Sequence, residues 1–216
     1  MKKVILLAVA FMVLLAGNAF ATPAIDGSIG AGEWSSGLLL NVIDSNESNI
    51  PDNYDIKRLA MVMETSGGGS GLYILSEVYG TPTLSSLDEL PPIDPVFYSI
   101  GLDMNQDGDF SDLADRIVDY RLSGFSVYNG LGAVVTGAST VATGSVVEFY
   151  IPAAVFANFP DSGFSTFALL DNGGAPPDDR LPNEGTFKTP EPGSMALVGM
   201  GLVGFLGSMF RRKFNA

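Results

Sequence analysis

The chain has 216 residues, carries a formal net charge of −13 at pH 7, and contains neither cysteine nor histidine. So acidic a surface repels the phosphates of nucleic acids and anionic lipids, which makes both poor partners for the folded protein. Without histidine the chain lacks the usual general base and zinc ligand, and without cysteine it forms no disulfides. The fold must therefore depend on its hydrophobic core and on any bound cations.

The first 21 residues predict a secretory signal peptide. Lys2 and Lys3 precede an apolar run, Val4–Leu15, and the stretch ends in AFA (19–21), the small-residue pattern that signal peptidase cleaves. The alternative is an N-terminal anchor helix, but the apolar run is short for an anchor and the A-x-A ending favours cleavage. We therefore expect an exported protein whose mature chain begins at Thr22.

Residues 22–170 predict an all-β domain, an antiparallel β-sandwich. Apolar runs of strand length recur between turn signals, and sustained helical periodicity is absent. Many short strands without crossover helices favour antiparallel sheets. One short helical turn is expected at Ala153–Phe159, behind Pro152. The expected strands are Leu38–Ile43, Ile56–Met63, Leu72–Val78, Val96–Leu102, Ile117–Leu122, Phe125–Tyr128, Ala133–Thr136, Val146–Ile151 and Phe164–Leu170.

Polar stretches rich in glycine or proline separate these strands. Asp44–Asp55 is acidic, Ser66–Gly71 is a flexible connection, and Gly80–Pro95 is long for a loop in a compact domain. Residues 171–189 contain many Gly, Pro and Asp residues and few apolar ones. This composition predicts a flexible linker between the domain and the C-terminal segment.

An Asp-rich loop within GLDMNQDGDFSDLADR (101–116) predicts a calcium site. Short oxygen-bearing side chains occupy positions 1, 3 and 5 of a D-x-N-x-D-G pattern, and on a tight loop they converge on one point. Phe110 is expected to point inward. Position 12, which carries a bidentate glutamate in helical EF-hands, is Ala114, so Asp112 or Asp115 would close the sphere. The alternative is a solvated hairpin connection without a cation. The candidate calcium ligands are Asp103, Asn105, Asp107, Asp109 through its main-chain carbonyl, Asp112 and Asp115.

Two short motifs in the domain resemble a known group of proteins. PAIDGSIGAGEW (23–34) and VVEFYIPAAVF (146–156) are similar to the opening motif and a late strand of family 9 carbohydrate-binding modules and DOMON-like β-sandwiches. The resemblance implies a β-sandwich over roughly residues 24–170, and sugar binding by stacked aromatic rings. Trp34 belongs to the opening motif and is expected to pack in the core. Tyr54 and Tyr79, in or beside loops, are the candidate residues for stacking on a sugar; the alternative for both is ordinary packing.

The acidic residues do not form an evident catalytic pair. Most of them cluster in loops and in the calcium-type run, whereas a general acid or base would be better signalled by a lone acid on an apolar strand. Glu148 is the nearest case, but it fits the strand motif of the resembling group, and we expect it to face solvent or a cation. The sequence therefore predicts a protein that is not an enzyme.

The C-terminal segment, 190–213, resembles the PEP-CTERM sorting signal. The motif residues are Pro190, Glu191, Pro192 and the basic cluster Arg211, Arg212 and Lys213, on either side of an apolar stretch. The resemblance implies a helix that halts in the inner membrane until an exosortase-type enzyme cuts near the PEP triplet. Eighteen uncharged residues, Gly193–Phe210, would span about 27 Å as a helix, and the basic cluster obeys the positive-inside rule. The alternative is a permanent membrane anchor.

These observations predict a signal peptide (1–21), a β-sandwich (22–170), a linker (171–189) and a sorting signal with a transmembrane helix (190–213). We expect an exported, calcium-stabilised protein of the cell surface or extracellular matrix. The alternative is a carbohydrate-binding protein that recognises exopolysaccharide. Signal peptidase, an exosortase-type enzyme and, in transit, the inner membrane are the expected partners.

Overall fold

The structure is a computed structural model that describes residues 22–35, 37–64, 70–84, 97–135, 137, 139–156, 163–171, 179–182 and 184–189. The expected signal peptide, the expected transmembrane helix and the six residues of the expected sorting motif lie outside these ranges. Across the described ranges, no helix has the length and apolar character needed to cross a membrane.

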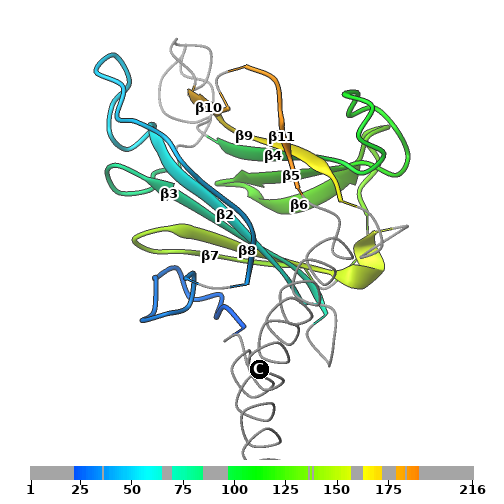
Figure 1. The fold of residues 1–216 in the computed structure, drawn as a ribbon, viewed down its shortest axis with the longest axis horizontal. Coiled ribbons are helices and arrows are strands. Elements are labelled where there is room, and N and C mark those ends of the chain that lie inside the picture. The colour runs from blue at the N-terminus through cyan, green and yellow to red at the C-terminus, as the bar shows by residue number, and fades with distance from the viewer. Residues whose placement is uncertain are drawn as a thin grey trace, which may run out of the picture.

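The described chain forms two antiparallel sheets that pack face to face (Figure 1). The first sheet has the order β1-β2-β3-β8-β7; the second has the order β10-β9-β4-β5-β6, with β11 also paired to β9. The all-β, antiparallel prediction is confirmed. The strands are β1 (Leu38–Ile43), β2 (Ile56–Glu64), β3 (Gly71–Val78), β4 (Phe97–Asp103), β5 (Arg116–Arg121), β6 (Gly124–Asn129), β7 (Thr140–Thr143), β8 (Val147–Pro152), β9 (Ser165–Asp171), β10 (Asp179–Leu181) and β11 (Phe187–Lys188).

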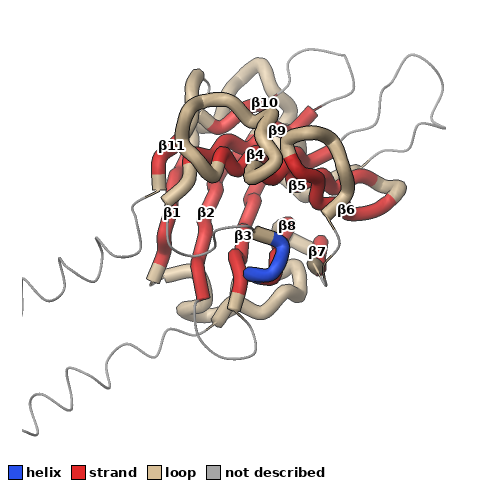
Figure 2. Tube along the Cα trace, turned by 90° about the vertical axis from the view of Figure 1, so that its right-hand side faces the viewer, coloured by secondary structure: helices blue, strands red, loops and turns tan. Residues whose placement is uncertain are grey.

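The main core lies between the sheets. Alternate residues of β8, Val147, Phe149 and Ile151, point into it and are fully buried, as the period of two along a strand requires. Facing residues such as Ile100 and Leu170 come from β4 and β9 of the other sheet. Figure 2 shows the two layers from the side, with a 3₁₀ turn, Ala153–Val155, at the end of β8.

A second, smaller core covers the outer face of the first sheet. Trp34, from the N-terminal segment, is buried there against Tyr73, Leu75 and Val146. This placement agrees with the expected core role of the tryptophan. Because the N-terminal segment crosses this face, β3 is buried on both sides over most of its length.

Glu148 lies inside this second core and does not face solvent, contrary to expectation. It is fully buried, and its Oε1 accepts a hydrogen bond from Trp34 Nε1 at 2.9 Å. Its Oε2 accepts hydrogen bonds from the main-chain N–H groups of Gly27 at 2.8 Å and Asp26 at 3.1 Å. The N-terminal segment brings donors to a buried face, and one carboxylate satisfies three of them, so Glu148 fastens that segment to the sheet.

Several elements differ from the expectation at the sheet edges. Among the described residues of the expected strand Ala133–Thr136, which are 133–135, Val134 pairs through an isolated bridge to Tyr128 and no strand forms. The edge strand β7 was not expected. Two short strands, β10 and β11, lie within 171–189, the stretch expected to be a flexible linker. They pair with β9, and the Thr189 hydroxyl bonds both the N–H and the carbonyl of Phe164.

Candidate functional site

The Asp-rich loop joins β4 to β5 and is built on two buried carboxylates. Asp103, the last residue of β4, accepts hydrogen bonds from the N–H groups of Gln106 at 2.6 Å and Gly108 at 2.9 Å. These bonds wrap the chain tightly, and Gln106 and Gly108 accordingly adopt positive φ angles of 61° and 90°. Glycine relieves the steric penalty of this conformation at position 108.

Asp115 closes the loop from its other end. One carboxylate oxygen accepts a hydrogen bond from the N–H of Met104 and the other from the N–H of Asp112, both at 2.9 Å. Burial raises the pKa of Asp115, the two hydrogen bonds oppose that rise, and the nearby charges of Asp103 and Asp112 add to it. Asp103 and Asp115 therefore serve first as acceptors for the loop's own backbone.

The exposed side of the loop brings three of the expected ligands together. The Asn105 amide nitrogen donates to Asp107 Oδ2 at 2.9 Å and to Asp112 Oδ2 at 2.6 Å. The carboxylates of Asp107 and Asp112 thus converge on one point, and the amide N–H₂ group of Asn105 occupies that point. The Asp109 carboxylate is not part of this group: it accepts a hydrogen bond from the Ser111 N–H at 2.9 Å, and hydrogen bonds from Ser111 lower its pKa. The main-chain carbonyl of Asp109 stays a predicted ligand.

The fit of this loop to calcium is partial. Asn105, Asp107 and Asp112 meet at the mouth, but Asn105 would have to present its amide oxygen there for a cation to replace the donor. The other two carboxylates, Asp103 and Asp115, lie deeper and hold backbone N–H groups. In the part of the chain that the structure describes, no three acidic side chains already surround a position suited to a metal ion.

The scaffold under the loop uses residues that the sequence did not single out. The buried Arg116 guanidinium donates to the carbonyls of Leu113, Ala114 and Asp115, and its Nε donates to Val155 O at 2.6 Å, tying the loop to the 3₁₀ turn. Burial lowers the pKa of Arg116. A lone arginine after an acidic run gives no sequence signal for this role, because its partners are carbonyl groups.

Two aromatic rings and one glycine complete the scaffold. Phe110, which was expected to point inward, is half-buried and packs edge-to-face on Phe167 with ring centroids 4.9 Å apart, on the face of β9 opposite the core residues Ala168 and Leu170. Gly130 lies against the loop so closely that a Cβ atom would fall 2.4 Å from Asp112 O. The Gly130 N–H donates to that same oxygen at 3.0 Å. A side chain at position 130 would push the loop away from β6.

The two tyrosines proposed as sugar contacts lie at the other end of the molecule, near the loop that follows β1. Tyr54 is half-buried and packs against the main core. The Tyr79 hydroxyl donates to the main-chain oxygen of Asp44 at 2.7 Å. Both rings are thus engaged within the fold, and neither lines a described hollow.

An open hollow of about 560 Å³ lies instead on the exposed face of β5 and β6. Tyr128 supplies an aromatic ring, and Asp119 and Arg121 supply a carboxylate and a guanidinium joined by a hydrogen bond of 3.1 Å. Asn129 and Gly130 lead from this hollow to the Asp-rich loop. Tyr128 could not be selected from the sequence, because alternation along one strand does not show which face of the sheet is hollowed.

Comparison with known families bears on the C-terminal segment. The profile of the PEP-CTERM protein-sorting motif matches residues 188–213. The predicted sorting motif is therefore confirmed, and it supports an exported protein that transits the membrane and is processed by an exosortase-type enzyme. Among curated proteins, none matches the chain.

Proposed function

We propose that this chain is a non-enzymatic β-sandwich that acts at the cell surface or in the extracellular matrix after its sorting signal is cut. The observation that carries the proposal is the PEP-CTERM motif at 188–213, directly after an acidic all-β body. A strongly negative body stays soluble once released and does not adhere to anionic lipid heads. The motif would hold the chain in the inner membrane until cleavage near Pro190–Pro192 frees that body.

The buried acids support a structural rather than a catalytic role. A general acid or base needs a perturbed carboxyl group that a substrate can reach. Glu148, Asp103 and Asp115 are all buried, and each is bonded to main-chain N–H groups that hold a segment in place. These carboxylates stabilise local turns and the N-terminal segment.

Calcium stabilisation at the β4–β5 loop is part of the proposal. Asn105, Asp107 and Asp112 would hold the ion at the exposed mouth, because these side chains already gather around one point. Bound there, calcium would offset the repulsion among five aspartates within thirteen residues of chain. The buried Asp103 and Asp115 would fix the loop's shape around it.

Recognition of an exopolysaccharide is the second candidate, and the hollow on β5 and β6 favours it. Sugar recognition combines an aromatic face with hydrogen-bonding groups that fix orientation, and Tyr128 beside Asp119 and Arg121 offers that combination. Glycan-array binding that Tyr128→Ala removes and Tyr79→Phe retains would support this candidate. If the folded protein binds no glycan on the array, exopolysaccharide recognition is ruled out and the matrix role would not involve a sugar ligand.

Fractionation of the exporting cells tests the first proposal. We expect the wild-type protein outside the inner membrane, and a variant with Pro190, Glu191 and Pro192 replaced by alanine to accumulate in that membrane. The matched control replaces Pro176 and Pro177, a nearby proline pair outside the motif. Equal release of both variants, with the C-terminal segment still attached, would overturn the proposal.

A further inference from the structure

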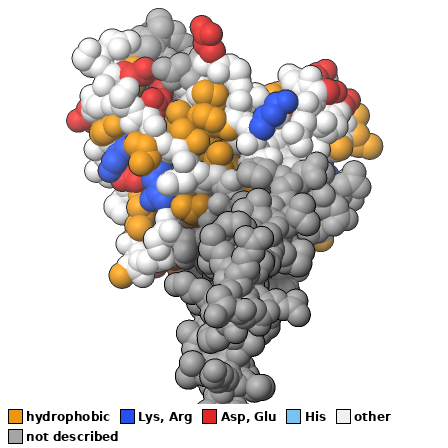
Figure 3. All heavy atoms as spheres, viewed as in Figure 1, with side chains coloured by type: hydrophobic (Ala, Val, Ile, Leu, Met, Phe, Trp, Pro, Cys, Tyr) orange, Lys and Arg blue, Asp and Glu red, His pale blue; other side chains and the backbone are white. Residues whose placement is uncertain are grey.

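A second group of acidic residues lies at the end of the sandwich away from the β4–β5 loop. Asp44 follows β1, Asp55 immediately precedes β2, and Asp179 opens β10. Asp179 pairs with Leu170, which pairs with Tyr98, whereas the β4–β5 loop begins at the far end of β4. We call Asp44, Asp55 and Asp179 the edge cluster. Acidic side chains are visible on this end of the molecule and on the end that carries the β4–β5 loop (Figure 3).

The three carboxylates of the edge cluster are close enough to influence one another. The Asp179 carboxylate accepts a hydrogen bond from the N–H of Ile56, the residue after Asp55. The pKa of Asp179 is raised to about 6, first by burial and then by the charges of Glu47, Asp55 and Asp44. Burial raises the pKa of Asp55 as well, with further contributions from Asp44 and Asp52. The charges that raise these pKa values are all negative.

Two carboxylate oxygens of the edge cluster are buried without a hydrogen-bond partner among the described residues. Asp55 is 0% exposed; its Oδ2 accepts a bond from the Glu47 N–H at 2.7 Å, but its Oδ1 has no partner. Asp44 Oδ2 is likewise buried and without a partner. A buried carboxylate oxygen in this state carries a large desolvation penalty, which a proton or a cation would remove.

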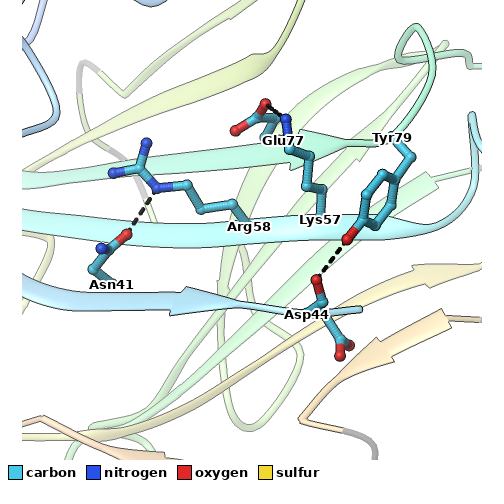
Figure 4. A network of polar contacts seen from close by, with 6 residues as sticks. All are labelled: Asn41, Asp44, Lys57, Arg58, Glu77 and Tyr79. Atoms are coloured by element: carbon cyan, nitrogen blue, oxygen red, sulfur yellow. Dashed lines mark hydrogen bonds and ion pairs between the residues drawn. The ribbon is translucent and has the colours of Figure 1, made fainter. Parts of the chain in front are cut away.

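The basic side chains closest in sequence are directed to other partners. Lys57 pairs with Glu77, and Arg58 donates to Asn41 and to the main-chain oxygen of Trp34. Figure 4 shows the Asp44 carboxylate pointing away from both Lys57 and Arg58, while its main-chain oxygen receives the Tyr79 hydroxyl. Arg180, next to Asp179, donates to the carbonyls of Pro182 and Gly185.

We propose that the edge cluster binds a divalent cation, with calcium as the ion whose chemistry fits best. The available ligands are all oxygens, and calcium accepts carboxylates together with main-chain carbonyls and water in a flexible sphere. No three acidic side chains of the described chain surround a ready-made metal position. Binding therefore uses Asp44 Oδ2 and Asp55 Oδ1 as the first ligands, adds carbonyl or water oxygens, and draws in Asp179. This site is separate from the β4–β5 loop and goes beyond the function proposed above.

A cation at the edge cluster would connect the two sheets. Asp44 and Asp55 border β1 and β2 of the first sheet, and Asp179 belongs to β10 of the second. The ion would fasten β10 to the sandwich, and β10 belongs to the short stretch of chain that leads to the sorting motif at 188–213.

Calcium titration of the full chain in detergent at pH 7.5 tests the proposal. The background variant is Asp107→Asn/Asp112→Asn, which removes the candidate ligands of the β4–β5 loop. We expect this variant still to bind one calcium ion, with a rise in melting temperature. Adding Asp55→Asn should weaken that binding by roughly tenfold or more, and the exposed-face control Asp119→Asn should leave it unchanged. Circular dichroism checks the fold of each variant.

Two results would overturn the edge-cluster site. The first is the absence of calcium binding at millimolar concentration in the folded background variant, whose edge cluster is intact. The second is a pair of melting-temperature results. Calcium leaves the melting temperature of the background variant unchanged, and Asp55→Asn raises it by the same amount with and without calcium. That pattern would show that a proton, and not a metal ion, satisfies the buried oxygens.

Discussion

The β4–β5 loop and the edge cluster are both acidic, but their carboxylate oxygens differ in how many hydrogen-bond donors they receive. In the loop, Asp103 and Asp115 receive two main-chain N–H bonds each, and Asn105 bridges the two exposed carboxylates. In the edge cluster, Asp44 and Asp55 each keep a buried oxygen without a partner in the described chain. The loop has the ligand spacing that is recognisable in sequence, whereas in the edge cluster a bound cation would remove the larger desolvation penalty.

The largest effect is expected from truncating a buried loop carboxylate. Asp115→Ala would leave the N–H groups of Met104 and Asp112 without acceptors, at a cost of about 2–4 kcal/mol in the free energy of unfolding. Urea denaturation measures the change. Asp119→Ala, which removes the partly buried partner of the half-exposed Arg121, should cost under about 1 kcal/mol. Equal costs for the two variants would mean that the buried hydrogen bonds do not hold the loop together.

The second-largest effect is expected in the pH dependence of stability, to which Asp179 of the edge cluster contributes. Burial and nearby negative charges raise the pKa of Asp179 from its ordinary value of 3.8 to about 6, so the folded protein binds the extra proton and stability falls as pH rises from about 4 to 6. We expect this contribution to be on the order of 1–3 kcal/mol in EDTA. Asp179→Asn should abolish it in a comparison of thermal unfolding curves. Calcium should flatten the wild-type curve, because a bound cation favours the charged carboxylate. A wild-type curve with the same slope in calcium and in EDTA would contradict this.

The effect of one edge-cluster substitution on stability should change sign when calcium is added. In EDTA, Asp55→Asn removes a like charge and supplies an amide donor, which should stabilise the fold by about 1 kcal/mol. In calcium the wild type should become the more stable of the two, because only it binds the ion tightly. Melting temperatures of both proteins in the two buffers measure the reversal. An unchanged order would place the cation elsewhere.

The smallest effect is expected at the mouth of the loop. Asp107→Asn keeps the side-chain oxygen that accepts the Asp109 N–H, and the residue is exposed, so in EDTA the change should stay within about 0.5 kcal/mol. A larger loss in calcium than in EDTA would support the loop as a calcium ligand set. Identical values in both buffers would remove the loop from the account.

The strands that could be predicted from sequence are those whose apolar side chains form a run of strand length between turn signals. Leu38–Ile43 matches β1 residue for residue, and the apolar alternation of β8 places Val147 and Phe149 in the core. The edge strands β7 and β10 escaped prediction because they are short and polar, and their pairing depends on neighbours distant in sequence.

The same limit applies to the sites. The loop at 103–115 could be found because its acidic residues lie in one short stretch of chain with the spacing of calcium-binding loops. The edge cluster could not, because Asp55 and Asp179 meet only when β10 reaches the start of β2. Glu148 was misjudged for a related reason: the sequence does not show that the segment carrying Gly27 and Trp34 covers the outer face of the sheet.

Native mass spectrometry of the protein released from exporting cells tests the account most directly, because one spectrum reports both chain ends and the bound ions. We predict a chain that begins at Thr22, ends near Pro190–Pro192, and carries at least one calcium ion at neutral pH. A released chain that retains the segment up to Lys213 and carries no calcium would contradict both the sorting and the cation chemistry proposed for this protein.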